Sequence, residues 1–373
     1  MMTPVLLTDL TPEEMAHALA IKPYQGRQLF RWLHKKRVFD FERMTDLSKE
    51  LRESLRRRCR VPQLELVEVL RSRQSPGTKK ALFRLHDGEC VESVLIRDGN
   101  RRTICLSTQV GCAIQCAFCA TGLEGFTRNL SAGEIVEQAL MLLVDEDLQD
   151  RTPNIVYMGM GEPFRNYEAT VRSIRLLMAR EGVGAGARKI TVSTVGDVAG
   201  IRRFAREPWQ VRLSVSLHAA NNALRSRLVP LNKHYPLETL LAAVKDYIAE
   251  TGRQVTFEWT LMDGVNDSRS DAEELAKLAG QLRVVINLIP FNFVSGLPAT
   301  LPGRGSIQLA PPSTKRCEAF RDALLAENVK CTLRKERGQD IAAACGQLRA
   351  HNSSGQRGRV DPGQPGEIGR GAQ

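Results

Sequence analysis

The sequence has no long hydrophobic run. No stretch approaches the roughly 20 apolar residues that a membrane-spanning helix needs. Its first residues, MMTPVLLTDLTPEEM, have neither the basic segment nor the extended apolar core of a secretory signal. A heptad pattern and an apolar surface stripe are also missing, which favours a monomer. These absences predict a cytoplasmic protein that makes no membrane contact.

Acidic residues are outnumbered by basic ones. The chain of 373 residues contains 53 Lys and Arg against 42 Asp and Glu, which gives a formal net charge of +11 and a pI near 9.4. An anionic partner is therefore plausible, and nucleic acid is the commonest one. A soluble enzyme of another kind with a basic surface fits the charge equally well.

Nine cysteines are present. Because the cytoplasm keeps thiols reduced, structural disulfides are not expected, and clustered cysteines there indicate metal ligands or catalytic groups. Their spacing must distinguish these uses.

Composition divides the chain into four parts. In the first part, Thr11, Pro12 and Glu14 form the signature of a helix start, and basic runs follow among aromatic residues. The parts are a basic helical accessory domain (1–62), a β-hairpin linker region (63–100), an α/β core with a C-terminal segment (101–348) and a tail predicted to be disordered (349–373).

The core alternates β-rich runs with amphipathic helical ones, which indicates a parallel sheet, either open or closed into a full or partial barrel. The predicted strands are Thr103–Ser107, Ile155–Gly159, Lys189–Ser193, Val211–Leu217, Val255–Leu261 and Val284–Ile289. The predicted helices are Ala132–Asp145, Tyr167–Arg180, Val198–Arg206, Leu237–Thr251, Asp271–Gln281 and Lys315–Glu327. Unusual polar residues follow the strands, so in a βα barrel they would meet at the carboxyl ends.

One loop has three closely spaced cysteines, Cys112, Cys116 and Cys119, in a CxxxCxxC pattern. Three thiolates can hold three irons of a 4Fe–4S cluster and leave the fourth iron open to a small molecule. The alternative is zinc, but structural zinc prefers four ligands and usually a second CxxC pair, which this loop does not supply.

CxxxCxxC is the signature of the radical SAM superfamily, which this chain resembles, and Phe118 before the last cysteine suits that pattern. The resemblance implies a partial (βα)6 barrel in which the open iron binds S-adenosylmethionine and the cluster generates a 5′-deoxyadenosyl radical. The segment MGMGEP is similar to the family's methionyl-binding segment, in which Gly161 permits close approach and Glu162 faces the ammonium.

A closer resemblance covers about residues 10–350. The segments YQGRQLFRWLHKKRVFDFERMTDLSKEL, VGCAIQCAFCATG, MGMGEP, ITVSTVG, SVSLHA, DGVNDS and DIAAACGQLR resemble the RlmN/Cfr family of RNA adenine methyltransferases. The resemblance implies methylation of adenosine C2 in 23S ribosomal RNA, with adenosine 37 of some transfer RNAs as a second substrate, and two molecules of S-adenosylmethionine per turnover. The Cfr branch methylates C8 instead; the N-terminal part and AACGQL look closer to the RlmN branch.

The family chemistry implies roles for three further residues. By resemblance, Cys345 accepts a methyl group, a radical formed on that methyl adds to the base, and Cys105 then attacks the linking sulfur and leaves a disulfide. Glu92 matches the family's proton acceptor and competes with Cys105 for that step. Without the family, Cys105 reads as a buried core cysteine. The remaining cysteines are expected to pack: Cys59, Cys90, Cys317 and Cys331.

Further cofactor contacts are implied at strand ends. These positions are Ser193, Ser216, Leu217, His218 and Asn292. For His218 the alternative is a satisfied interior histidine, and main-chain groups of its segment are as good candidates as the side chain. The basic N-terminal domain would grip RNA while the target base is extruded. A reductant such as flavodoxin is implied by analogy.

Three features depart from the family pattern: Ala220, Phe293 and a long segment at Leu297–Ala310. These departures concern the shape of loops.

Two other functions compete with that of an RNA methyltransferase. One is a non-catalytic RNA-binding assembly factor with a structural metal, and the other is a radical SAM enzyme that acts on protein or a small molecule. The first leaves Cys345, Cys105 and Glu92 without a purpose, and the second leaves the basic helical domain unexplained.

Overall fold

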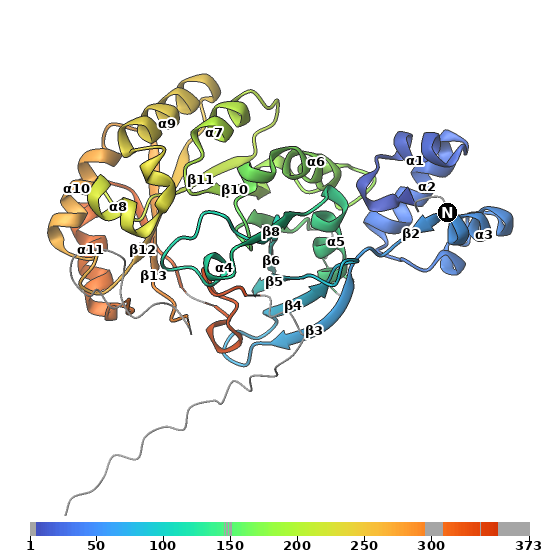
Figure 1. Ribbon diagram of the computed structural model, residues 1–373, viewed down its shortest axis with the longest axis horizontal. Helices are drawn as coiled ribbons and strands as arrows, with labels where there is room; N and C mark the ends of the chain where they lie inside the picture. Colours follow the sequence, from blue (N-terminus) through green and yellow to red (C-terminus); the bar gives the residue numbers. More distant parts are fainter. Residues whose placement is uncertain are drawn as a thin grey trace, which may run out of the picture.

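The computed structural model describes residues 5–144, 146, 148, 151–294, 309–335 and 337–349. A small helical module at the N-terminus stands beside a larger α/β body (Figure 1). The predicted disordered tail, residues 349–373, lies outside the described residues except for Arg349, and so does most of the long segment at 297–310. Among the described residues, no helix is both long and apolar enough to cross a membrane.

The N-terminal module begins its first helix where the sequence predicts. The Thr11 hydroxyl accepts from the Glu14 amide at 3.3 Å, and the Glu14 carboxylate accepts from the Thr11 amide at 2.8 Å. Two short parallel strands, β1 and β2, bring the ends of the module together. Its elements are β1 (Val5–Leu6), η1 (Leu7–Asp9), α1 (Pro12–Leu19), α2 (Pro23–Phe30), the π-helix η2 (Arg31–Lys35), η3 (Phe41–Arg43), α3 (Lys49–Arg58) and β2 (Cys59–Arg60).

The α/β body is built on one ten-stranded sheet with the order β14-β13-β12-β11-β10-β9-β6-β5-β4-β3. All neighbours from β6 to β14 are parallel, which confirms the predicted α/β fold with a partial barrel. The parallel strands are β6 (Arg101–Cys105), β9 (Asn154–Tyr157), β10 (Ile190–Thr194), β11 (Arg212–Ser216), β12 (Val255–Leu261), β13 (Val284–Pro290) and β14 (Cys331–Leu333). The sequence missed β14, because three residues are too few to show a period.

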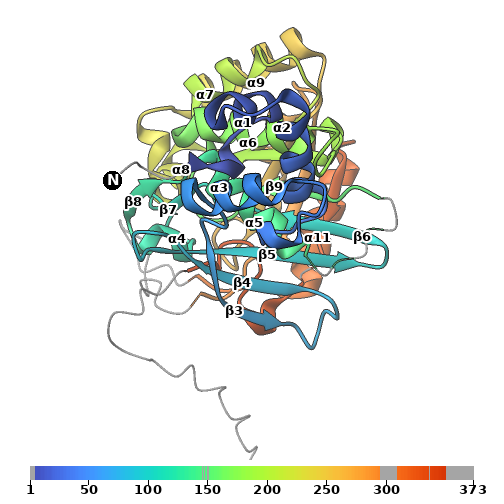
Figure 2. The same cartoon turned by 90° about the vertical axis from the view of Figure 1, so that its right-hand side faces the viewer.

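The region expected as a β-hairpin linker has a larger part in the fold. It forms β3 (Glu65–Arg71), β4 (Lys79–Arg84) and β5 (Cys90–Asp98), which pair antiparallel in sequence order. Strand β5 then pairs with β6. These strands therefore extend the main sheet at one edge, and a view from the side shows them running under the N-terminal helices (Figure 2).

Helices cover the outer face of the parallel strands (Figure 1). The apolar faces of most of them pack with the strands into one large core, whereas α8 and η6 pack with the cysteine loop in a second, smaller cluster. They are α5 (Ala132–Leu142), η4 (Pro163–Asn166), α6 (Tyr167–Met178), η5 (Ala187–Lys189), α7 (Val198–Ala205), α8 (Asn222–Leu228), η6 (Pro230–Lys233), α9 (Leu237–Thr251), α10 (Arg269–Ala279) and α11 (Thr314–Ala326). Ser131 and Glu134 form the predicted capping box at the start of α5.

The cysteine loop projects from the sheet between two short strands. β7 (Gln109–Gly111) and β8 (Phe126–Asn129) pair antiparallel and close the loop at its base, and α4 (Ala120–Leu123) ends the cysteine pattern. The C-terminal segment, which contains η7 (Gln339–Ile341), lies against this loop: the Ala120 amide donates to the Gly346 carbonyl at 2.8 Å. The first and last parts of the body thus meet at the sheet's inner face.

Candidate cofactor and catalytic site

Two cavities lie on the inner face of the parallel strands. The carboxyl-end chamber has about 910 Å³ of space, and the amino-end chamber has about 2040 Å³, both including their open mouths. The carboxyl-end chamber is lined by Cys112, Cys116, Phe118, Cys119, Thr121, Tyr157, Met158, Gly159, Gly161, Glu162, Ser193, Thr194, Val195, Ser216, His218, Glu258, Thr260, Ile289, Phe291, Cys345 and Gly346. Most of these follow or end a strand, as expected for a βα barrel.

The three loop cysteines are brought together on this chamber. Burial raises the pKa of Cys112 to about 12 and raises the pKa of Cys119, while backbone N–H groups oppose both shifts. The donors are the amides of Ile114 and Gln115 for Cys112, and those of Thr121 and Gly122 for Cys119. Amide donors aimed at sulfur are the contacts that cluster thiolates receive, so the loop fits a 4Fe–4S cluster.

A single ion would need a different arrangement. Within the parts of the chain that the structure describes, no three His, Cys, Asp or Glu side chains converge on one metal position. A cluster does not require such convergence, because its three cysteines bind three different irons.

The MGMGEP segment turns tightly at the edge of the chamber. Gly161 has φ +100°, and a Cβ there would lie 2.6 Å from the Cβ of Gln109, so both conformation and space require glycine. The Glu162 carboxylate accepts from the amides of Val195 at 2.9 Å and Phe164 at 3.1 Å. Burial raises the pKa of Glu162 to about 7. The carboxylate is therefore fixed by backbone groups at the chamber wall.

Other predicted cofactor contacts separate into two groups. Ser193, Ser216 and His218 line the carboxyl-end chamber. The His218 Nδ1 accepts from the Thr260 amide at 3.0 Å, and burial lowers the pKa of His218 to about 3, so the ring is neutral. The Leu217 side chain instead lies in the hydrophobic core and does not reach this chamber.

The predicted methyl carrier, Cys345, lines both chambers. Its sulfur lies 3.3 Å from Nη1 of Arg334, a residue that follows β14. Neighbouring Cys345 and Glu258 raise the pKa of Arg334. The Thr121 hydroxyl donates to the Leu348 carbonyl at 2.7 Å, which fixes the C-terminal segment against α4.

The amino-end chamber contains two other predicted residues. Its lining is Ile96, Asp98, Arg101, Thr103, Cys105, Val156, Met158, Thr191, Arg212, Thr256, Glu258, Val285, Asn287, Ile289, Asn292, Thr332, Arg334, Lys335, Arg337, Ala343, Ala344, Cys345 and Leu348. Cys105 therefore shares this chamber with Cys345. Asn292, predicted at the cofactor, also lies here and its amide nitrogen is 3.4 Å from the Cys345 carbonyl. All nine cysteines are free, so the disulfide is not present.

Glu92 is close to the C-terminal segment but lines neither chamber. Its carboxylate is 2.8 Å from Nζ of Lys80 and accepts from the Arg349 amide at 2.8 Å. Glu92 on β5 therefore forms a buried ion pair with Lys80 on β4.

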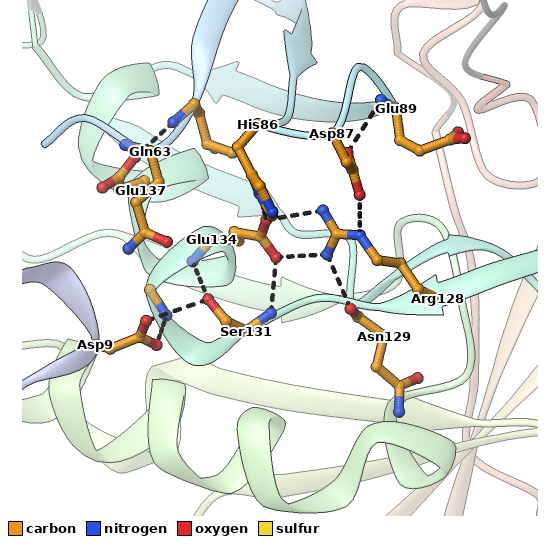
Figure 3. A network of polar contacts seen from close by, with 12 residues as sticks. Asp9, Gln63, His86, Asp87, Glu89, Arg128, Asn129, Ser131, Glu134 and Glu137 are labelled. Atoms are coloured by element: carbon orange, nitrogen blue, oxygen red, sulfur yellow. Dashed lines mark hydrogen bonds and ion pairs between the residues drawn. The ribbon is translucent and has the colours of Figure 1, made fainter. Parts of the chain in front are cut away.

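The N-terminal module is held on α5 by carboxylates (Figure 3). Asp9 accepts from the Gly133 amide at 2.5 Å, and Glu137 accepts from the amides of Gln63 and Leu64 at 2.6 and 2.9 Å. Arg128 on β8 forms two hydrogen bonds of 2.9 Å with Glu134 of the same helix. Helix α5 therefore connects the module to the strand that closes the cysteine loop.

Comparison with known proteins agrees with this geometry. Residues 5–61 match the ribosomal RNA large subunit methyltransferase N-terminal domain, and residues 106–279 match the radical SAM superfamily. The chain is 45% identical over 358 residues to the probable dual-specificity RNA methyltransferase RlmN of Moorella thermoacetica, covering 94% of this chain and 98% of that protein. The Thermotoga neapolitana RlmN is 44% identical over 346 residues, covering 92% and 97%. The chain belongs to the RlmN family.

A solved structure supports the same fold for this RlmN family member. The radical SAM methyltransferase from Sphaerobacter thermophilus is 48% identical and superposes with a TM-score of 0.87, covering 93% of this chain and 100% of that one.

Sequence reasoning missed three residues of this RlmN site. Arg334 follows the strand that was not predicted. Glu258 is a buried acid in the apolar run VTFEWTL, and that charge was a usable signal. Arg225 is 1% exposed and donates to the carbonyls of Leu217 and Val195, which ties two strand ends together behind the carboxyl-end chamber.

Proposed function

We propose that this chain methylates C2 of an adenosine in 23S ribosomal RNA, and adenosine 37 of some transfer RNAs, with Cys345 as the methyl carrier. Membership of the RlmN family makes the chain an S-adenosylmethionine-dependent RNA methyltransferase of the radical SAM class. The observation that carries the role of Cys345 as methyl carrier is its position, because Cys345 lines both chambers. A carrier must reach the methyl source on one side and the base on the other.

The carboxyl-end chamber suits the cofactors. Cys112, Cys116 and Cys119 would hold a 4Fe–4S cluster, with Gly161 and Glu162 at the methionyl part of S-adenosylmethionine and Ser193, Ser216 and His218 at the remainder. When bound, the cluster and S-adenosylmethionine supply a methyl group and a carbon-centred radical. The radical is needed because C2 of adenine has no lone pair to attack a sulfonium methyl group.

Two cysteines of the chain then have different roles. Cys345 receives the methyl group on Sγ, and one hydrogen atom of this methyl group is lost to the radical. The same carbon then bonds to C2 of the base while it remains on the sulfur, and the adduct gives up one electron and the C2 proton. Cys105, as the thiolate, attacks Sγ of Cys345, and the carbon–sulfur bond breaks with its electron pair on the carbon, which takes up a proton to become the methyl group. The two cysteines are left as a disulfide that an external reductant returns to two thiols. Burial raises the pKa of Cys105 to about 12, so a base must remove its proton before it attacks.

The proton of C2 needs an acceptor. Glu92 and Cys105 compete for this role, and their positions differ: Cys105 lines the amino-end chamber, whereas Glu92 is paired with Lys80. Asn292, near the Cys345 carbonyl, would hold the segment that contains Cys345 in place.

The enzyme acts as a cytoplasmic monomer, and a flavodoxin-type protein supplies electrons.

The test is methylation of unmodified RNA by the reconstituted enzyme under anaerobic conditions. Wild type should form 2-methyladenosine by mass spectrometry, Cys345→Ala should form none, and Cys105→Ala should accumulate a covalent protein–RNA adduct. Formation of 8-methyladenosine would reject C2 in favour of Cfr-type chemistry. Methylation by Cys345→Ala at the wild-type rate would reject the carrier.

A further inference from the structure

The amino-end chamber has an unusual interior for a βα barrel. Such barrels normally fill this space with branched apolar side chains. Here alternate strands place threonines inward, namely Thr103 on β6, Thr191 on β10 and Thr256 on β12, and none of them is fully buried. The strands beside them contribute Val156 and Val285. The chamber is therefore a partly polar hollow with access to solvent.

Three exposed cations line this hollow. Arg101 begins β6 and Arg212 begins β11, whereas Lys335 follows the carboxyl end of β14. Within the described ranges, none of the three forms an ion pair or a side-chain hydrogen bond. The nearby Arg337 differs, because it pairs with Asp98 at 2.6 Å. This set of three unpaired positive charges suits an anionic ligand.

The inner end of the hollow contains two thiols and a cation. Cys105 and Cys345 line it, and Arg334 lies beside the Cys345 sulfur. The carboxyl-end chamber is lined by Cys345 but not by Cys105. A group that contacts both cysteines therefore lies in the amino-end chamber.

We infer that the target nucleotide enters the barrel through the amino ends of the strands, and that Arg101 and Arg212 at these ends, together with Lys335 on the segment after β14, hold the phosphates on either side of it. This inference rests on the proposed function and names the route and the contacts of its RNA substrate. Without its open mouth the chamber has a cavity volume of about 700 Å³, within the roughly 300–1,000 Å³ of ligand pockets, which is enough for one nucleotide. Phosphate contacts by Lys and Arg position a strand without reading its sequence.

The test compares two reactions of the same full-length holoenzyme. S-methylation of Cys345 by S-adenosylmethionine, followed by mass spectrometry, needs no RNA, whereas RNA methylation needs the proposed entrance. The triple variant R101Q/R212Q/K335Q should S-methylate Cys345 at the wild-type rate. Its KM for RNA should rise on the order of tenfold, and the slope of log affinity against log salt should fall by about 2, because about 0.7 is lost for each single-strand phosphate contact.

A second variant tests the route apart from charge. Thr191→Phe narrows the hollow and adds no charge, so it should lower kcat/KM for RNA by tenfold or more and leave S-methylation of Cys345 intact. Arg202→Gln, which removes an exposed arginine from α7, is the matched control and should change neither reaction. Retained S-methylation shows that each variant is folded.

The outcomes separate the two proposals. Unchanged RNA affinity and salt slope in the triple variant, or normal RNA methylation by Thr191→Phe, would overturn this entrance. If wild type binds RNA and forms no methylated base, the proposed function fails, and the entrance is then judged by fluorescence anisotropy with the same RNA. A tenfold loss of affinity in the triple variant alone would still support it.

Discussion

The two chambers of this RlmN family member are built in different ways. The carboxyl-end chamber is formed mainly by loops that each contribute several residues close in sequence, such as those in Cys112–Cys119 and Gly159–Glu162. The amino-end chamber is formed largely by single inward side chains from separate strands, such as Thr191 and Arg212. Loops can hold several ligands of one cofactor, whereas strands present isolated groups around a space. The first arrangement suits cofactors that need several ligands, and the second suits a large substrate.

The largest expected effect comes from the cysteine loop. Cys116→Ala removes one of the three proposed cluster ligands, so the iron–sulfur absorbance and the formation of methylated RNA should both fall below detection. Cys331→Ser removes a half-buried cysteine, far from the loop in sequence, and should retain both properties. A Cys116→Ala enzyme with full iron content and activity would show that the loop does not hold the cluster.

A substitution in the wall between the two chambers should have the next largest effect on RNA methylation. Arg334→Met leaves the Cys345 sulfur and Glu258 without their cation while keeping an apolar side chain of similar length. A hydrogen bond from a charged donor contributes about 1.5–3 kcal/mol, so we expect kcat for RNA methylation to fall roughly 10- to 100-fold. Single-turnover methylation at saturating RNA measures this change.

The lysine variant separates charge from packing. Arg334→Lys keeps the cation but has a single ammonium group in place of the guanidinium fork, so it should recover part of the rate. Equal rates for Arg334→Met and wild type would mean that Arg334 only fills space beside Cys345.

Two glycine-to-alanine variants test whether the geometry of the MGMGEP turn is required for cofactor binding. Gly161→Ala places a Cβ 2.6 Å from Gln109 at a φ of +100°, and such strain costs about 1–3 kcal/mol. The KM for S-adenosylmethionine should rise on the order of tenfold in the S-methylation of Cys345. Gly186→Ala, where a Cβ meets nothing within 4 Å, is the control. If both variants behave alike, the MGMGEP turn does not set cofactor affinity.

The difference between the chambers also explains what the sequence could predict. Six parallel strands, the helix start at Thr11 and the loop cysteines were predicted because each depends on neighbours in sequence. The family resemblance added Cys345, whose place beside α4 depends on contacts across more than 200 residues, such as Thr121 with Leu348. Hydrophobic periodicity contains no such information.

Other features of the site depend on tertiary contacts alone. Arg334 follows a three-residue strand, and Arg101 or Arg212 is one arginine among many until the sheet brings both to one rim. Leu217 ends one predicted strand and Asn292 follows another, yet Leu217 points into the core and Asn292 lines the second chamber. The direction of a side chain after a strand ends is set by the turn, which strand patterns do not specify.

The smallest effect on chemistry should come from a buried acid outside both chambers. Burial raises the pKa of Glu137 from 4.5 to about 7. A carboxyl group whose pKa is higher in the folded state binds protons more tightly there, so its stabilising effect is complete below about pH 4.5 and is lost as the pH rises through 7.

Glutamine at position 137 copies the protonated form. In Glu137→Gln, the amide nitrogen can donate to the Thr8 hydroxyl while the oxygen still accepts from the amides of Gln63 and Leu64. The variant should match wild type near pH 4.5 and exceed its free energy of unfolding by up to about 3 kcal/mol at pH 8, measured by urea unfolding. Glu168→Gln alters an exposed acid and should show no such difference. Because Glu137 anchors the N-terminal module and touches neither chamber, S-methylation of Cys345 should be unchanged; a loss of that reaction would mean that the module's contact with α5 also shapes the carboxyl-end chamber.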